Sequence, residues 1–168
     1  MVKLSLATSK LAEILGLELS GQDVQVSGVA ISAGEVEPGD LFVAVAGAKH
    51  HGIDFLDQAI SNGAVAVLSD KPCEKLPSLR AADPKSLIGE VCNLVLGECE
   101  LDLYAVTGTN GKTSTSTYLY QLLQKLGKKP GLSGSTGMYC EGYSAVAALT
   151  TSELTTTRKF LARVQASG

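Results

Sequence analysis

The stretch that decides the fold is Leu101-Asp-Leu-Tyr-Ala-Val-Thr-Gly-Thr-Asn-Gly-Lys-Thr-Ser114. Its first six residues form a short apolar run that is typical of a strand. A loop with two glycines follows, and the residues from Lys112 to Leu126 favour a helix that ends at Gly127. A strand, a glycine-containing loop and a helix that opens with Lys-Thr, in this order, predict a loop that binds phosphate.

Each part of residues 107–114 has a predicted task. Gly108 and Gly111 allow tight turns that aim backbone N–H groups at phosphate oxygens, and the dipole of the following helix favours the same anion. We expect Lys112 to reach the terminal phosphates as the catalytic residue, and the Thr113 hydroxyl to complete the shell of a Mg²⁺ ion. The predicted ATP-binding residues are Gly108, Thr109, Asn110, Gly111, Lys112, Thr113 and Ser114. The plainer alternative is a glycine-rich turn before a helix that happens to contain Lys-Thr.

The residues before this loop predict a separate small α/β domain. Residues 41–46 and 64–68 are apolar runs suited to buried strands, and residues 54–62 between them favour a helix with Phe55 inward. The other predicted elements are a helix at 8–16 capped by Thr8 or Ser9, a strand at 24–31 and a helix at 84–96. Gly97–Glu100 marks the predicted boundary between domains at 1–98 and 99–168.

Composition argues against several classes of protein. The net charge is −3 and aromatic residues make up 5%, so the sequence shows neither a basic stripe nor stacking platforms for nucleic acid. The four cysteines lie far apart and the two histidines are adjacent, which disfavours a zinc site. No apolar run is long enough for a membrane span or a secretory signal. We therefore expect a cytoplasmic protein that binds neither nucleic acid nor membrane.

The loop form Thr-Gly-Thr-Asn-Gly-Lys-Thr resembles that of the Mur ligases and the related folylpolyglutamate synthetases. The general P-loop pattern has a glycine where this chain has Val106. The segments 26–47 and 51–55 are similar to the UDP-sugar-binding domain of Mur ligases, which folylpolyglutamate synthetases lack. Together with Leu149-Thr-Thr151, they most resemble the family members that add the third amino acid to the cell-wall precursor.

The resemblance implies two substrate regions and two domain roles. Domain 1–98 would bind the UDP-N-acetylmuramoyl (UDP-MurNAc) part of the substrate, and residues 99–168 would be the first, incomplete part of a central ATP-binding domain with a mainly parallel sheet. The family's Asp-Ser-Arg motif falls on Ser32-Ala33-Gly34, so its aspartate and arginine are absent here. The implied contacts with the UDP-MurNAc-peptide are Ser32, Ala48, Lys49, His50, Thr150 and Thr151. Without a ligand, Thr150 and Thr151 are equally consistent with helix capping, and Lys49 and His50 with a solvated loop tip.

The reaction that the resemblance implies joins an amino acid to UDP-MurNAc-L-Ala-D-Glu, with ATP and Mg²⁺, through an acyl phosphate. Only residues 113–168 follow Lys112, too few for the rest of a parallel ATPase sheet, so we expect no ligase activity from these residues alone. Two alternatives stay open: a nucleotide- or UDP-sugar-binding module without catalysis, and another Mur-type or folylpolyglutamate synthetase-like ligase.

Overall fold

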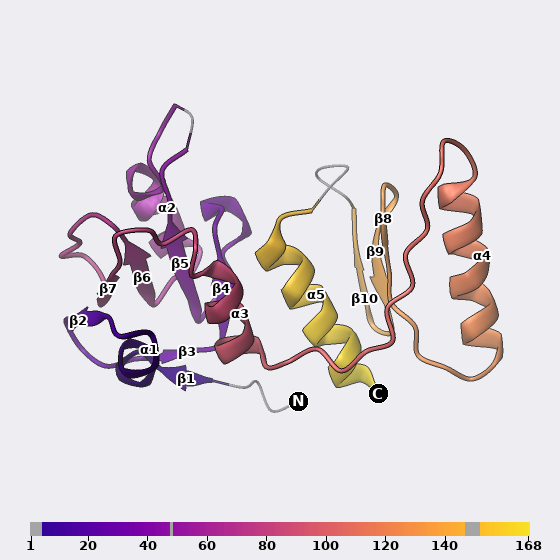
Figure 1. Ribbon diagram of the computed structural model, residues 1–168, viewed down its shortest axis with the longest axis horizontal. Helices are drawn as coiled ribbons and strands as arrows, with labels where there is room; N and C mark the ends of the chain where they lie inside the picture. Colours follow the sequence, from indigo (N-terminus) through magenta and orange to yellow (C-terminus); the bar gives the residue numbers. More distant parts are fainter. Residues whose placement is uncertain (1–4, 48, 147–151) are drawn as a thin grey trace. The chain divides into compact units, whose positions relative to one another are not determined.

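The computed structural model describes residues 5–47, 49–146 and 152–168 of the chain (Figure 1). The chain divides into two compact units, Met1–Glu98 and Cys99–Gly168. Each unit has its own sheet and its own apolar core.

The first unit is built on a five-stranded sheet with the order β2-β7-β6-β5-β4. Strands β4, β5, β6 and β7 are parallel, and β2 pairs antiparallel with β7 at one edge. A separate antiparallel pair joins β1 to β3. The bounds of the strands are β1 (Leu6–Ala7), β2 (Glu18–Ser20), β3 (Gln25–Val26), β4 (Gly28–Ala30), β5 (Asp40–Ala44), β6 (Ala66–Ser69) and β7 (Ser78–Arg80).

Helices pack on both faces of this sheet because its central strands are apolar on both sides. Leu41 and Val43 of β5 pack in one cluster with α1 (Thr8–Leu15) and α3 (Ile88–Leu96). Phe42 and Ala44 point to the opposite face, against α2 (Leu56–Ser61). Two short 3₁₀ helices, η1 (Ala33–Glu35) and η2 (Gly52–Phe55), follow β4 and β5. The sheet is therefore the middle layer of a three-layer α/β unit.

The second unit contains two long helices and a small antiparallel sheet of order β10-β9-β8. Its elements are α4 (Lys112–Lys125), β8 (Leu132–Gly134), β9 (Gly137–Cys140), β10 (Tyr143–Ala145) and α5 (Leu154–Ser167). The core is small: Met138 and Cys140 of β9 pack against Phe160 and Val164 of α5. Helix α4 has no buried residue among its fourteen. The second unit thus rests on contacts between β9 and α5.

The predicted fold class is confirmed as α/β with a mostly parallel central sheet. The helix predicted from Lys112 is also confirmed, and Gly127 adopts the left-handed backbone that ends it, with φ of 75°. In the second unit the described strands pair antiparallel, whereas the sequence suggested a mainly parallel sheet there.

Three local predictions were wrong. Residues 101–106 form no strand, because no described segment pairs with them and a strand needs hydrogen bonds from a neighbour. Phe55 is 44% exposed, because residues 52–55 form a 3₁₀ turn whose side chains do not follow the α-helical period. Neither Thr8 nor Ser9 is the N-cap residue of α1, which is Ala7; the carboxylate of Asp23 accepts the hydrogen bond from the Ser9 N–H instead.

Among the described residues, no helix is long and apolar enough to cross a membrane.

Candidate functional site

The glycine loop of the second unit has the backbone that its sequence predicts. Gly108 has φ of 146° and Gly111 has φ of 78°, a region that residues with a side chain rarely adopt. Gly111 is also the N-cap residue of α4, and no side chain caps that helix end. Four N–H groups at the start of a helix lack intrahelical partners, so this end of a fourteen-residue helix suits an anion.

The two side chains predicted to bind phosphate and Mg²⁺, those of Lys112 and Thr113, lie in the first turn of α4. The Lys112 ammonium donates hydrogen bonds to the carbonyl oxygens of Gly108, at 2.5 Å, and Thr109, at 3.4 Å. The Thr113 hydroxyl lies 3.4 Å from that of Ser135, which comes from the turn between β8 and β9. All residues from 107 to 114 are exposed. A lysine, exposed backbone amides and paired hydroxyls are groups that hold a triphosphate and its Mg²⁺ ion.

A second group of polar residues follows the strands of the first unit. Ser32 comes two residues after β4, Lys49 and His50 lie in the loop after β5, and Asp70 directly follows β6. Because β4, β5 and β6 are parallel neighbours, their carboxyl ends meet at one edge of the sheet. Ligands of open α/β sheets bind at this edge. Ser32, Lys49 and His50 are all exposed there.

The loop after β5 is closed by short contacts within itself. The Gly47 N–H donates to the His50 carbonyl at 2.9 Å, and the Gly52 N–H donates to the Val45 carbonyl at 2.8 Å. A side chain on Gly52 would meet the Ala44 Cα at 2.8 Å, so only glycine fits this position without a shift. The His50 ring meets Phe55 edge-on with 5.9 Å between ring centroids. The loop is therefore a compact structure that presents Lys49 and His50 to solvent.

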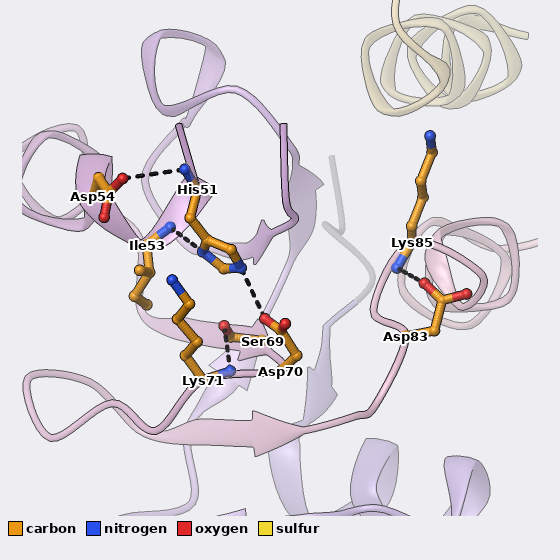
Figure 2. Close-up of polar contacts among 8 residues, drawn as sticks. All are labelled: His51, Ile53, Asp54, Ser69, Asp70, Lys71, Asp83 and Lys85. Atoms are coloured by element: carbon orange, nitrogen blue, oxygen red, sulfur yellow. Dashed lines mark hydrogen bonds and ion pairs between the residues drawn. The ribbon is translucent and has the colours of Figure 1, made fainter. Parts of the chain in front are cut away.

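His51 connects this loop to the next strand, as Figure 2 shows. Its Nδ1 accepts a hydrogen bond from the Ile53 N–H at 3.1 Å, so its Nε2 carries the proton and donates to Asp70 at 2.8 Å. The His51 N–H donates to Asp54 at 3.1 Å, which completes a capping box at η2. The His51 side chain is only 9% exposed.

The carboxyl of Asp70 has a lowered pKa. Desolvation of this carboxyl raises the pKa, but the hydrogen bond from His51, together with the nearby positive charge and a backbone hydrogen bond, stabilises the charged form by more. Asp70 is therefore ionised at neutral pH, and the bond from the His51 Nε2–H is a charge-assisted one.

Not every predicted site residue falls within the described part of the chain. Ala48, Thr150 and Thr151 lie outside the described residues. The residues predicted to bind ATP, 108–114, lie in the glycine loop and the first turn of α4, and Ser32, Lys49 and His50 follow neighbouring parallel strands.

Sequence reasoning missed three residues of these regions: His51, Asp70 and Ser135. Asp70 could have been found as the polar residue that directly follows a buried strand, which is where site residues of α/β sheets occur. The contact of Ser135 with Thr113 joins residues 22 positions apart and has no local signal.

Two family models match the chain in separate regions. The model described as "Mur ligase family, catalytic domain" matches residues 25–88, and the model described as "Mur ligase middle domain" matches residues 106–168. The chain belongs to the Mur ligase family. The two matches follow the two units of the structure: the first runs from β3 to the start of α3 and includes the parallel strands β4 to β7, and the second begins just before the glycine loop.

Relatives with known names support this membership. A UDP-N-acetylmuramyl-tripeptide synthetase of Leifsonia xyli subsp. xyli is 35% identical over 95% of this chain and 33% of its own length. A UDP-N-acetylmuramoyl-L-alanyl-D-glutamate–2,6-diaminopimelate ligase of Xanthomonas oryzae pv. oryzae is 36% identical over 98% of this chain and 34% of its own length. This chain thus spans about a third of the length of these relatives.

A solved structure of a UDP-N-acetylmuramoyl-L-alanyl-D-glutamate–2,6-diaminopimelate ligase shares the fold. It aligns with 98% of this chain and 34% of its own, with a TM-score of 0.63 and 22% sequence identity. At this sequence identity the similarity supports the fold alone.

Proposed function

We propose that this Mur ligase acts in the step that adds the third amino acid to UDP-MurNAc-L-Ala-D-Glu. The observation that carries the proposal is the glycine loop 107–114 at the start of α4, in a chain whose two relatives above are named for forming this tripeptide. Units 1–98 and 99–168 would hold the UDP-MurNAc-peptide and ATP, respectively.

The proposed reaction begins at the glycine loop. Lys112 and the amides of residues 108–114 would hold the phosphates of ATP and align the terminal phosphate with the D-glutamyl carboxylate. Transfer of the terminal phosphoryl group from ATP to the carboxylate gives an acyl phosphate and releases ADP. The amine of the amino acid then attacks the acyl carbon and loses a proton, and phosphate leaves as the amide forms. The Thr113 hydroxyl fits a Mg²⁺ ligand, and the ion would neutralise phosphate charge.

The carboxyl edge of the first sheet would hold the UDP-sugar. Lys49 offers a positive charge for the diphosphate, His50 offers ring nitrogens, and Ser32 offers a hydroxyl in place of the family's Asp-Ser-Arg motif. Thr150 and Thr151, outside the described residues, remain proposed contacts with the peptide part. We expect residues 1–168 to bind both ligands. Because these residues span a third of the relatives' length, we expect them to form no amide by themselves.

A thermal-shift titration tests this proposal. A ligand at 100 times its dissociation constant stabilises the folded protein by about 2.7 kcal/mol. We expect a clear rise in melting temperature with UDP-MurNAc-L-Ala-D-Glu, a smaller one with UDP-glucose, and a rise with ATP–Mg²⁺. A folate substrate serves as the control for the alternative ligase and should cause no shift. A shift with folate and none with the muramoyl precursor would refute the proposed substrate.

A further inference from the structure

The pair formed by His51 and Asp70 lies beside the loop after β5, and neither residue has a role in the site proposed so far. We infer that this pair is a positioning device: it holds Gly47, Lys49 and His50, after β5, in the arrangement that receives the UDP-sugar diphosphate. The inference rests on the proposed function of the first unit, and it adds two residues to it.

The first support is the number of elements that meet at the His51 side chain. Its Nδ1 caps η2 through the Ile53 N–H, and its Nε2–H reaches Asp70 after β6. The backbone of His51 forms an antiparallel bridge with Ala46, at the other end of the same loop. The backbone of His51 therefore joins the two ends of the loop, and its side chain ties them to η2 and to the residue after β6.

The second support is that Asp70 is itself held in place. It directly follows Ser69, which is 1% exposed, and the Ser69 hydroxyl accepts a hydrogen bond from the Lys71 N–H at 3.1 Å (Figure 2). The carbonyl of Ser69 accepts from the Ala81 N–H at 3.1 Å, just beyond β7. The backbone on both sides of Asp70 is thus held by hydrogen bonds, in a position from which the carboxylate accepts from His51.

The third support is that His51 makes a hydrogen bond that capping of η2 does not require. His51 is largely buried, and its bond is to an ionised carboxylate whose pKa is lowered by that contact. A cap for η2 needs only a short acceptor such as the side chain of Asn or Asp, and the reach to Asp70 needs the second ring nitrogen. The histidine therefore does more than cap a turn, and its extra bond fixes the loop that displays Lys49 and His50.

A loop that is already in its binding conformation loses less entropy when the ligand binds, so the pair should raise affinity without touching the ligand. This gives the pair a measurable signature. Loss of the bond should weaken binding of the UDP-sugar substrate and leave ATP binding at residues 107–114 unchanged.

The test uses the full 168-residue chain and four variants. His51→Asn keeps an acceptor for the Ile53 N–H but cannot reach Asp70, and Asp70→Ala removes the anchor. Asp70→Asn keeps an oxygen that can accept from Nε2 and should rescue most of the function. Asp57→Asn is the matched control, because it removes an exposed carboxylate that pairs with Lys75 in the same unit.

Two readouts are measured for each variant. Calorimetry with UDP-MurNAc-L-Ala-D-Glu and with ATP–Mg²⁺ gives the two affinities. Hydrogen exchange of the Gly47 and Gly52 amides, followed by NMR without ligand, reports how firmly the loop is closed. We expect His51→Asn and Asp70→Ala to weaken UDP-sugar binding about tenfold or more, with faster exchange of both amides and unchanged ATP affinity. Asp70→Asn should stay within about threefold of the unchanged protein, and Asp57→Asn should match it.

Each other outcome overturns the inference in a recognisable way. If His51→Asn and Asp70→Ala bind the UDP-sugar normally, the pair does not position the loop. If they weaken both ligands alike, the pair is a general stabilising contact. If the unchanged protein fails to bind the UDP-sugar, the proposed function of the first unit fails and the positioning role fails with it, whatever the amide exchange shows.

Discussion

At the scale of single residues, Lys112 is held by hydrogen bonds to its own glycine loop. Its ammonium is bonded to two carbonyl oxygens of its own loop, at 2.5 Å and 3.4 Å. A phosphate is a stronger acceptor than a carbonyl because it is charged. The lysine could therefore exchange these carbonyl oxygens for a phosphate oxygen without a large movement of the chain.

The first prediction concerns this lysine. Lys112→Ala should weaken ATP–Mg²⁺ binding by about tenfold to a hundredfold, because a hydrogen bond to a charged group is worth about 1.5–3 kcal/mol. Binding of UDP-MurNAc-L-Ala-D-Glu should not change. The control is Lys125→Ala, which removes a lysine from the last turn of the same helix. Calorimetry on both variants decides, and equal loss of ATP affinity in the two would contradict the assignment.

The second prediction concerns Asp23, whose carboxylate accepts hydrogen bonds from Ser9 and Thr8 at the start of α1. The bond from the Ser9 N–H is the main cause of its lowered pKa. A carboxyl whose pKa is lowered in the folded state stabilises the protein above its unfolded pKa, near 3.8, and loses this effect as pH falls through the folded value.

Thermal unfolding between pH 2.5 and 5 checks this prediction. The melting temperature of the unchanged protein should fall more steeply below about pH 4 than that of Asp23→Asn, whose amide does not titrate there. Above pH 5 the unchanged protein should be the more stable of the two. Parallel curves for the two proteins would show that Asp23 does not stabilise the helix through its charge.

At the scale of elements, sequence patterns predicted the parts that depend on local order. Gly16, with φ of 63°, ends α1, and the apolar runs around Phe42 and Val67 are the buried central strands. Local patterns did not predict features made by distant partners. The cap of α1 comes from Asp23, β7 (Ser78–Arg80) lies in a stretch that looked irregular, and residues 101–106 lack a described partner strand.

The same distinction holds for the candidate site. The glycine loop was predictable because its signal lies in eight consecutive residues, and the loop after β5 because it follows a buried strand. The bond between His51 and Asp70 was not predictable, since it joins residues 19 positions apart and depends on the pairing of β5 with β6. A local sequence pattern predicts where a loop lies, but the contacts of that loop depend on which strands pair in the sheet.

The third prediction concerns close packing at η2. Gly52→Ala would place a methyl group 2.8 Å from the Ala44 Cα and 2.9 Å from the Val45 nitrogen, both backbone atoms that cannot turn away. We expect a loss of about 1–3 kcal/mol in the free energy of unfolding, measured with urea. The matched control is Gly89→Ala in α3, where the new methyl group meets nothing within 4 Å.

That control should stabilise the protein by about 0.5–1 kcal/mol, because alanine favours a helix interior more than glycine does. If Gly52→Ala and Gly89→Ala shift the free energy of unfolding in the same direction, the close approach of η2 to β5 is not present in the folded protein.

At the scale of the whole molecule, the chain has two cores of unequal size. The first unit buries two apolar clusters, one on each face of its sheet, whereas the second unit buries Met138, Cys140, Phe160 and Val164. Helix α4 exposes Tyr118 and Leu122, and Leu126 just after it is exposed too, so this helix adds little to the second core. Stability of the second unit should therefore depend on very few side chains.

The fourth prediction follows from this difference. Phe160→Ala should cost about 3–5 kcal/mol and unfold the second unit first, because the ring is 3% exposed and central to that small core. ATP binding should be lost while UDP-MurNAc-L-Ala-D-Glu still binds. Leu154→Ala, at a position 49% exposed in the same helix, serves as the control and should retain both ligands. Loss of UDP-sugar binding in Phe160→Ala would show that the second unit is needed to fold the first.

Calorimetric titration of the chain with each ligand, while the other is saturating, tests directly whether the two units bind different substrates. We expect one site for UDP-MurNAc-L-Ala-D-Glu and one for ATP–Mg²⁺, each occupied in the presence of the other. Lys112→Ala should remove only the second site, and Asp70→Ala should weaken only the first. Displacement of one ligand by the other, or failure of the muramoyl precursor to bind at all, would contradict the account.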